Sequence, residues 1–189
     1  RSNKLALTLN ASADSISYGE DAVIFVDLPS DAGGNVSIDV NGKTYVNEYS
    51  ISDLGVGKYV ANVSYSGDEK YQPAFTSVEI NVELAQAVIH IVDENVYCSG
   101  QLMAVLSDLR GNPIQDAEVI VNINGENHDL FTDDAGKICI KLNLNAGRYD
   151  ATFNFKGMGN YSSLTCSYQI NVLTTIQAND MVRGYNSRV

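Results

Sequence analysis

Few residues in this sequence have the types and spacing that chemistry requires. The three cysteines are Cys98, Cys139 and Cys166, and none of them forms a C-x-x-C motif. The two histidines, His90 and His128, do not supply the other half of a zinc site. The sequence also lacks the G-x-S-x-G, H-E-x-x-H and phosphate-loop motifs. We therefore predict that the chain is not an enzyme, binds no metal and needs no cofactor.

The remaining polar candidates have structural explanations. His90 lies in an apolar strand pattern, which favours a core or edge histidine over a general base. Asp133 and Asp134, together with Asp129 or Asp108, could bind calcium through their carboxylate oxygens. Aspartates also stabilise tight turns by accepting hydrogen bonds from nearby backbone amides, and no run of several acidic residues supports calcium. We favour the turn.

Asn-x-Ser sequons are the remaining candidate sites, and they concern modification of the protein. Chance matches are frequent in a chain rich in Asn and Ser, so the sequons support a surface location only weakly. The candidate asparagines for N-glycosylation are Asn10, Asn35, Asn62 and Asn160.

The elements that must position these residues are organised by an internal repeat. Residues 57–71 align without a gap with residues 147–161; both segments begin with Gly-x-Tyr and end with Tyr. The match continues through the next segment, where residues 80–82 and 170–172 both read Ile-Asn-Val. A repeat of this length indicates two copies of one module of common sandwich size.

The repeat also sets the expected domain boundaries. We predict module one over residues 1–83, module two over 84–173, and a partial lead-in strand of a third repeat over 174–189. The linker, residues 83–86, contains no Gly or Pro, which predicts a restricted and extended arrangement. Because the sequence begins at Arg1 with no secretion signal, we expect it to be a fragment of a longer protein.

Alternating apolar and polar residues predict strands throughout, and no segment has a helical period. Asn41-Gly42 and Asn124-Gly125 are strong hairpin signals, because both turn residues must accept positive φ. The strands expected in module one cover residues 4–10, 21–27, 35–40, 44–51, 59–65 and 78–82, and those in module two cover 87–92, 101–108 and 118–123. The sequence therefore predicts two all-β modules, each with two facing sheets.

Module two has extra residues between its hairpin turn and its Gly-x-Tyr strand. They lie around the polar turn at residues 132–137 and are followed by a strand with Ile138, Ile140, Leu142 and Leu144 facing inward. This pattern predicts either one additional strand or a longer hairpin in module two.

The charge of the chain excludes several classes of partner. There are 12 basic residues against 23 acidic ones, a formal net charge of −11. Nucleic acids and anionic membrane surfaces attract clusters of Lys and Arg, so we predict contact with neither. The sequence also contains no apolar run of the length that spans a membrane.

The repeated block resembles the late strands of bacterial and archaeal immunoglobulin-like repeat domains. Tyr59 and Tyr149, at the head of that block, are similar to the tyrosine corner of such sandwiches. The turn at residues 111–114 (Gly-Asn-Pro-Ile) and the one at 132–137 also resemble this family. Together with the tail at 179–187, the chain is similar to adhesin-like surface proteins of methanogenic archaea.

The resemblance implies an all-β fold of tandem immunoglobulin-like β-sandwich domains at the cell surface. It also implies an extracellular stalk or attachment module whose partners are neighbouring repeats and a cell-surface glycan or protein ligand. Two alternatives stay open. The modules could be accessory domains of a large secreted enzyme that acts on polysaccharides or cell walls, or part of a surface layer.

In sandwiches of this kind, the segment before the second strand runs beside the last strand. Cys98 lies in that segment, and Cys166 shares the inward face of the last strand with Tyr168 and Ile170. A Cys98–Cys166 disulfide would suit an extracellular compartment and would stabilise the module by roughly 3–5 kcal/mol. The alternative is three free thiols. We expect Cys139 to face outward and stay unpaired.

Overall fold

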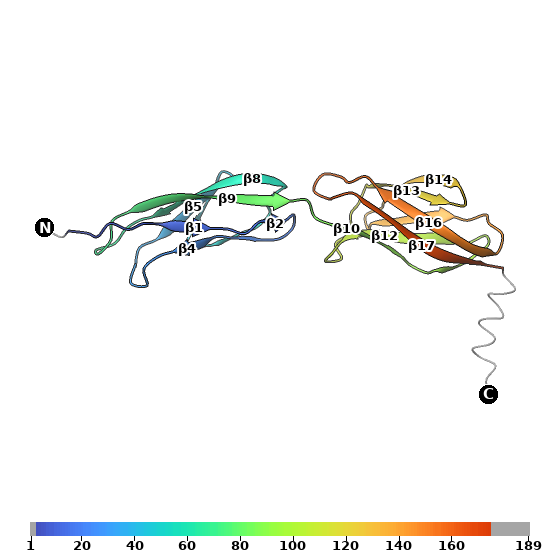
Figure 1. Ribbon diagram of the computed structural model, residues 1–189, viewed down its shortest axis with the longest axis horizontal. Helices are drawn as coiled ribbons and strands as arrows, with labels where there is room; N and C mark the ends of the chain where they lie inside the picture. The colour runs from blue at the N-terminus through green and yellow to red at the C-terminus, as the bar shows by residue number, and fades with distance from the viewer. Residues whose placement is uncertain (1–2, 175–189) are drawn as a thin grey trace, which may run out of the picture. The chain divides into compact units, whose positions relative to one another are not determined.

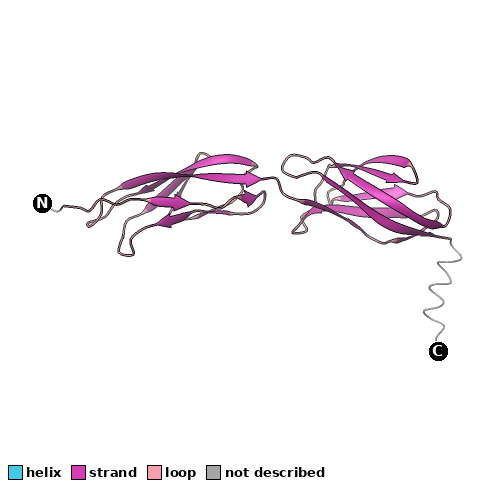
Figure 2. Ribbon diagram, viewed as in Figure 1, coloured by secondary structure: helices cyan, strands magenta, loops and turns pink. Residues whose placement is uncertain are grey.

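The computed structural model describes residues 3–174 and divides the chain into two compact units, Arg1–Ala85 and Gln86–Val189. We keep the names module one and module two for these units. The observed boundary falls two residues after the predicted one, since Leu84 and Ala85 belong to module one. Apart from Thr174, the expected lead-in strand lies outside the described residues. The described part of the chain contains strands and loops only, with no helix that could span a membrane (Figure 2).

Module one is a sandwich whose second layer is broken into two short sheets (Figure 1). The larger layer is a five-stranded sheet of order β2-β9-β8-β5-β6, and the facing layer consists of the pairs β1-β4 and β3-β7. The strands are β1 (Asn10–Ser12), β2 (Ile16–Ser17), β3 (Ala22–Val23), β4 (Phe25–Asp27), β5 (Val36–Val40), β6 (Lys43–Val46), β7 (Ser50–Ile51), β8 (Gly57–Tyr65) and β9 (Ala74–Glu83).

Module two has the same layout with a continuous second layer (Figure 1). A five-stranded sheet of order β11-β17-β16-β13-β14 faces a three-stranded sheet of order β10-β12-β15. The strands are β10 (Ala87–Ile91), β11 (Asn95–Tyr97), β12 (Gln101–Asp108), β13 (Glu118–Ile123), β14 (Glu126–Phe131), β15 (Lys137–Lys141), β16 (Gly147–Phe155) and β17 (Leu164–Leu173).

Each module buries its own core between its two layers. Successive residues of a strand point to opposite faces, so the predicted alternation places one apolar set inside. In module one the buried residues of both layers form a single cluster, which includes Ile24, Ile38, Ile51, Val63 and Ile80. In module two the corresponding cluster includes Leu106, Val121, Ile138, Phe153 and Ile170. Each module therefore has the core that independent folding requires.

The tyrosine at the head of the penultimate strand makes the same contact in both modules. Tyr59 Oη donates a hydrogen bond to the Gly55 carbonyl oxygen at 2.9 Å, and Tyr149 Oη donates to the Asn145 carbonyl oxygen at 2.8 Å. This is the tyrosine corner that the sequence predicted. In both modules, the first strand of the five-stranded sheet also pairs in parallel with the last strand, β2 with β9 and β11 with β17. Each module is an immunoglobulin-like β-sandwich.

The structure confirms the hairpin turns and corrects some strand boundaries. Asn41, Gly42, Asn124 and Gly125 all have positive φ, as both hairpins require. The strand predicted over residues 4–10 is instead a short strand at Asn10–Ser12, preceded by an isolated bridge at Leu5. The predicted strands 21–27 and 44–51 are each divided in two, because the chain passes from one pairing partner to another within them.

The extra residues of module two lengthen its hairpin without adding a strand. β14 and β15 occupy the places that β6 and β7 occupy in module one, and all four inward residues predicted for the second of them are buried or half-buried. β15 pairs with β12 over five residues, whereas β7 pairs with β3 over two. The longer hairpin therefore completes a sheet that stays broken in module one.

Candidate functional site

The cysteines do not form the predicted disulfide. All three are free, and Cys98 and Cys166 are both half-buried. The segment that carries Cys98 does run beside the last strand, as predicted: the Cys98 amide donates to the Leu173 carbonyl oxygen at 2.8 Å. At about 3.3 Å per residue, however, Leu173 lies roughly 23 Å along β17 from Cys166. A disulfide needs Cα atoms within about 7 Å, so the structure contradicts this pairing.

Cys139 and Cys166 lie in different environments. Cys139 is exposed on β15 opposite Met103, as its alternation predicted. Cys166 packs against the core, and this burial raises the pKa of its thiol. Thiol reactivity depends on the thiolate, so this raised pKa lowers the reactivity of Cys166.

The histidines and turn aspartates lie where local structure explains them. His90 is exposed on β10, an edge strand of its sheet, so it is the edge histidine of the two alternatives. His128 lies on β14 with Nε2 at 3.8 Å from Glu126 Oε2. Asp133 Oδ1 accepts hydrogen bonds from the Ala135 and Lys137 amides, both at 2.9 Å, which closes the β14–β15 turn. Within residues 3–174, no cluster of His, Cys, Asp or Glu is arranged to hold a metal ion.

Asp108, another calcium candidate, also serves a turn. Its carboxylate accepts hydrogen bonds at 2.9 Å from the Arg110 amide, from the Asn112 amide and from Asn112 Nδ2. Burial raises the pKa of Asp108, but these hydrogen bonds outweigh it, and the net pKa lies below the usual value. The carboxylate is therefore committed to the loop that follows β12.

The sequon asparagines differ in their exposure. Asn10, Asn35 and Asn62 are exposed, and Asn160 is half-buried in the turn between β16 and β17. Asn35 Oδ1 also accepts a hydrogen bond from Asn47 Nδ2 at 3.0 Å. Exposure is the condition that a glycosylation enzyme needs, and three of the four positions meet it.

The same end of each module carries a loop and a turn that the sequence analysis did not identify as a candidate site. In module one they are the β4–β5 loop (28–35) and the β8–β9 turn (66–73), and Asp68 of the turn joins them. Asp68 Oδ2 accepts hydrogen bonds from the Gly33 amide and from Tyr65 Oη, both at 2.8 Å. Oδ1 accepts from the Lys70 and Tyr71 amides, both at 2.7 Å. The amide of Gly33, then that of Tyr71 and the Tyr65 hydroxyl, hold the pKa of Asp68 well below its usual range.

A second carboxylate strengthens the same connection. Asp31 accepts hydrogen bonds from Lys70 Nζ and from Tyr71 Oη, and these two donors, Lys70 first, lower its pKa. The loop and the turn approach so closely that a Cβ on Gly34 would lie 2.4 Å from the Gly67 carbonyl oxygen. In module one, therefore, the loop is fastened to the turn by the module's own side chains.

Module two anchors its equivalent loop elsewhere. The β12–β13 loop (109–117) is held by Thr132, which lies just after β14 and is 2% exposed. Thr132 Oγ1 accepts a hydrogen bond from the Ala117 amide at 2.9 Å and donates to the Ile114 carbonyl oxygen at 2.7 Å. Its backbone adds bonds from the Asp116 amide and to the Ala117 carbonyl oxygen. The residues inserted in module two thus supply the anchor of this loop.

The inserted turn itself packs closely on β12. Gly136 has a φ of +73°, and a Cβ there would meet the Leu106 carbonyl oxygen at 2.3 Å. The Leu106 amide donates to the Gly136 carbonyl oxygen at 2.8 Å, and the Ile114 amide donates back to the Leu106 carbonyl oxygen at 3.0 Å. Loop and inserted turn therefore form one unit that does not need the β16–β17 turn (156–163).

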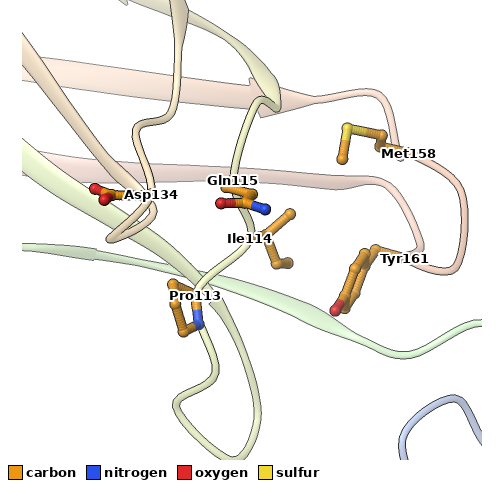
Figure 3. A pocket seen from close by; sticks show the side chains of 6 residues that line it. All are labelled: Pro113, Ile114, Gln115, Asp134, Met158 and Tyr161. Carbon is orange, nitrogen blue, oxygen red and sulfur yellow. The ribbon is translucent and has the colours of Figure 1, made fainter. Parts of the chain in front are cut away.

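Two neighbouring hollows lie beside the β16–β17 turn, and Met158 lines both. The Tyr161 hollow, of about 380 Å³, is lined by Pro113, Ile114, Gln115, Asp134, Met158 and Tyr161. In Figure 3, Pro113, Ile114 and Gln115 follow one another along the loop, while Met158 and Tyr161 come from the turn. The Phe131 hollow, of about 310 Å³, includes Asp116, Glu118, Phe131, Asn154 and Lys156 in its lining. These hollows are the candidate binding site.

A difference between the two copies of the repeat could have indicated this site from the sequence. Asp68 and Met158 occupy the same position of the aligned blocks, and the alignment places an acidic residue opposite an apolar one. Thr132 had no such signal, because it lies in the insertion and has no counterpart in module one.

No family model matches the sequence. No curated protein matches it either. Among solved structures, similar ones include the fibronectin(III)-like modules of CbhA from Clostridium thermocellum, at 15% identity and a TM-score of 0.35 over 89% of this chain and 95% of that one. A 1.5-MDa bacterial ice-binding adhesin is similar at 14% identity and a TM-score of 0.35, over 91% and 66% of the two chains. Parabacteroides merdae β-glucuronidase is similar at 10% identity and a TM-score of 0.36, over 84% and 23%. At these values the likenesses say nothing about what this chain binds.

Proposed function

We propose that the chain is part of an extracellular, adhesin-like surface protein, in which the tandem modules form a load-bearing stalk and module two contributes an attachment site. The observation that carries this proposal is the way each module ties its two ends together. Exposure of Asn10, Asn35 and Asn62 in sequons and the net charge of −11 agree with a surface location.

In each five-stranded sheet, an edge strand near the beginning of the module pairs in parallel with the last strand of the module. β2 pairs with β9 through Ile16–Val82 and Ser17–Glu83, and β11 pairs with β17 over three residue pairs. The Tyr18 amide donates to the Glu83 carbonyl oxygen in module one, as the Cys98 amide does to the Leu173 carbonyl oxygen in module two. In module two, a bond from the Asn171 amide to the Glu94 carbonyl oxygen adds to the pairing. When a chain is pulled from its two ends, parallel strands slide past each other. Their hydrogen bonds are then loaded together and not one after another.

A protein that joins a cell to a surface must resist unfolding under force, and this resistance is set by the unfolding rate. The β2–β9 and β11–β17 pairings supply this resistance. The linker between β9 and β10 consists of residues 84–86 alone. Attachment is assigned to the hollows around Met158, since they expose apolar and polar side chains at the same place.

Force spectroscopy on the whole chain, held at its two ends, tests the stalk. We expect two unfolding events, with module two resisting the greater force because its parallel pairing is longer. Cys98→Pro removes the amide that donates to Leu173 and should lower the force of one event only, while Cys98→Ala keeps the amide and should leave both forces unchanged. Unfolding of both modules at the low force of a peeled hairpin would refute the load-bearing role.

Antibody labelling tests the location. Antibodies raised against the chain should label intact cells of the source organism without permeabilisation. Labelling that requires permeabilised cells would contradict the extracellular part of the proposal.

A further inference from the structure

The two modules differ in the hydrogen bonding of their polar side chains at the loop end, which is the end that carries the β4–β5 loop in module one and the β12–β13 loop in module two. In module one, Asp31, Asp68, Lys70 and Tyr71 all bond to one another or to the loop. In module two, the side chains of Gln115, Asp116, Glu118, Asp134 and Lys156 line the hollows and form no hydrogen bond or ion pair within the described residues. Polar groups that a fold does not use for its own structure are free to bind a ligand.

Apolar surface lies between these polar groups. Phe131 is 64% exposed at the end of β14, and Met158, which lines both hollows, is 39% exposed. Glu118 lies directly opposite Phe131 across the β13–β14 pair, so a carboxylate stands beside the ring. An exposed ring offers a face to C–H groups, and neighbouring carboxylate and amide groups can bond to hydroxyls.

The volumes and charges of the hollows restrict the class of ligand that they could bind. Two adjoining hollows, of about 310 and 380 Å³, favour a chain of linked units over a single small molecule. Asp116, Glu118 and Asp134 face the site against one cation, Lys156. This excess of negative charge repels uronate, sulfate and phosphate groups. Alternating apolar faces and hydroxyl groups without acidic substituents are the surface of a neutral oligosaccharide.

We infer that the two hollows lined by Met158 form a binding site for a neutral oligosaccharide, with Phe131 as the stacking platform and Asp116, Glu118 and Gln115 as hydroxyl partners. This inference rests on the attachment part of the proposed function and names its ligand class. The stalk does not depend on it, because no residue that lines the hollows lies on β2, β9, β11 or β17.

The test is a nitrogen-15 NMR titration of the whole chain at millimolar probe concentrations. The probes are oligomers of β-1,4-linked glucose, of β-1,4-linked N-acetylglucosamine and of mannose, with oligogalacturonate as an anionic glycan and oligolysine as a cationic peptide. At least one neutral oligomer should give saturable shifts at residues 113–118, 131 and 154–158. Oligogalacturonate should give none.

Matched phenylalanine variants locate the site. Phe131→Ala should weaken binding about tenfold, as loss of a central aromatic contact does. Phe25→Ala removes an equally large ring that is 55% exposed in module one and should leave binding unchanged. Because both rings are exposed, neither variant threatens folding, and the unchanged remainder of each spectrum verifies this.

Three results would overturn the inference: no saturable shift with any neutral oligomer, shifts with oligolysine alone, or equal affinities for the two variants. Oligolysine binding alone would identify the hollows as a site for a basic peptide. Absence of glycan binding together with intact force resistance would refute the ligand inference and leave the load-bearing role unaffected. Loss of force resistance with intact glycan binding would do the reverse.

Discussion

The two modules anchor the equivalent loop at their loop ends through different residues. Module one fastens its β4–β5 loop to the β8–β9 turn through Asp68, whereas module two fastens the equivalent loop to the inserted turn through Thr132. The first solution brings loop and turn into contact and closes the end. The second secures the loop from the other side and leaves hollows beside Met158. A fold can thus be duplicated with a closed end in one copy and an end that carries hollows in the other.

The largest expected effect tests whether the modules are separate at all. Phe153 is fully buried in the core of module two. Phe153→Ala should destabilise module two by about 3–5 kcal/mol, because it leaves a cavity among close-packed neighbours. Calorimetry should show one transition moving to lower temperature while the other stays in place. If both transitions move together, the modules fold as one unit and cannot be compared as copies.

The next effect concerns the anchor of module two. Thr132→Val keeps the shape of the side chain but leaves the Ala117 amide and the Ile114 carbonyl without their buried partner. The expected loss is about 1–3 kcal/mol, confined to the transition of module two. Thr165→Val, at an exposed position on β17, is the matched control and should change little. Equal effects of the two variants would show that Thr132 is no anchor.

Acid should weaken the closed end of module one through Asp68. Its folded-state pKa lies below its usual value, so its charged form stabilises the fold above about pH 4, the unfolded value. That contribution is lost as pH falls from there toward the folded pKa. Asp68→Asn should flatten the pH dependence of module one's melting temperature below pH 4. The transition of module two, which has its own low-pKa carboxylate at Asp108, should be unaffected by this substitution.

A feature that both modules share should respond equally in both. Tyr59→Phe and Tyr149→Phe each remove one hydroxyl-to-carbonyl hydrogen bond, of 2.9 and 2.8 Å. Each substitution should cost about 1 kcal/mol in its own module. Urea titration of both variants checks this. A marked difference between them would mean that the two copies diverge in more than their loop ends.

The smallest expected effect on stability comes from Met158→Asp. The substitution introduces into module two the carboxylate that Asp68 supplies in module one. In module two, the loop is held by Thr132 and none of the described loop amides donates to this position. Stability should change by less than about 0.5 kcal/mol, as for surface substitutions generally. If Met158→Asp instead stabilised module two clearly, the loop and turn there would be poised to close, and the hollows would not be a built site. A chemical denaturation curve gives the answer.

Much of the fold could be predicted because its signals are local. Asn-Gly fixes the hairpins at Asn41 and Asn124, and alternation identifies the inward faces of the long strands. Repetition of Gly-x-Tyr gives both the module count and the tyrosine corners. These patterns depend on backbone geometry and on one buried face, which a short stretch of sequence records.

What could not be predicted depends on register and on long-range contacts. Cys98 was rightly placed beside the last strand, yet parallel pairing puts it at the far end from Cys166. The divided strand around Ile24 follows from the short reach of β7, which no local pattern reveals. Thr132 and Asp68 are ordinary turn residues in sequence, and only the approach of a distant loop makes them anchors.

Amide hydrogen exchange, followed by NMR on the whole chain, tests whether the loop ends of the two modules are anchored independently. The Gly33 and Ala117 amides should both be protected in the native protein, since each donates to an anchoring side chain. Asp68→Asn should speed exchange at Gly33 and leave Ala117 slow, and Thr132→Val should do the opposite. If either substitution releases both amides, or neither, the two loop ends are not anchored independently and the comparison between them fails.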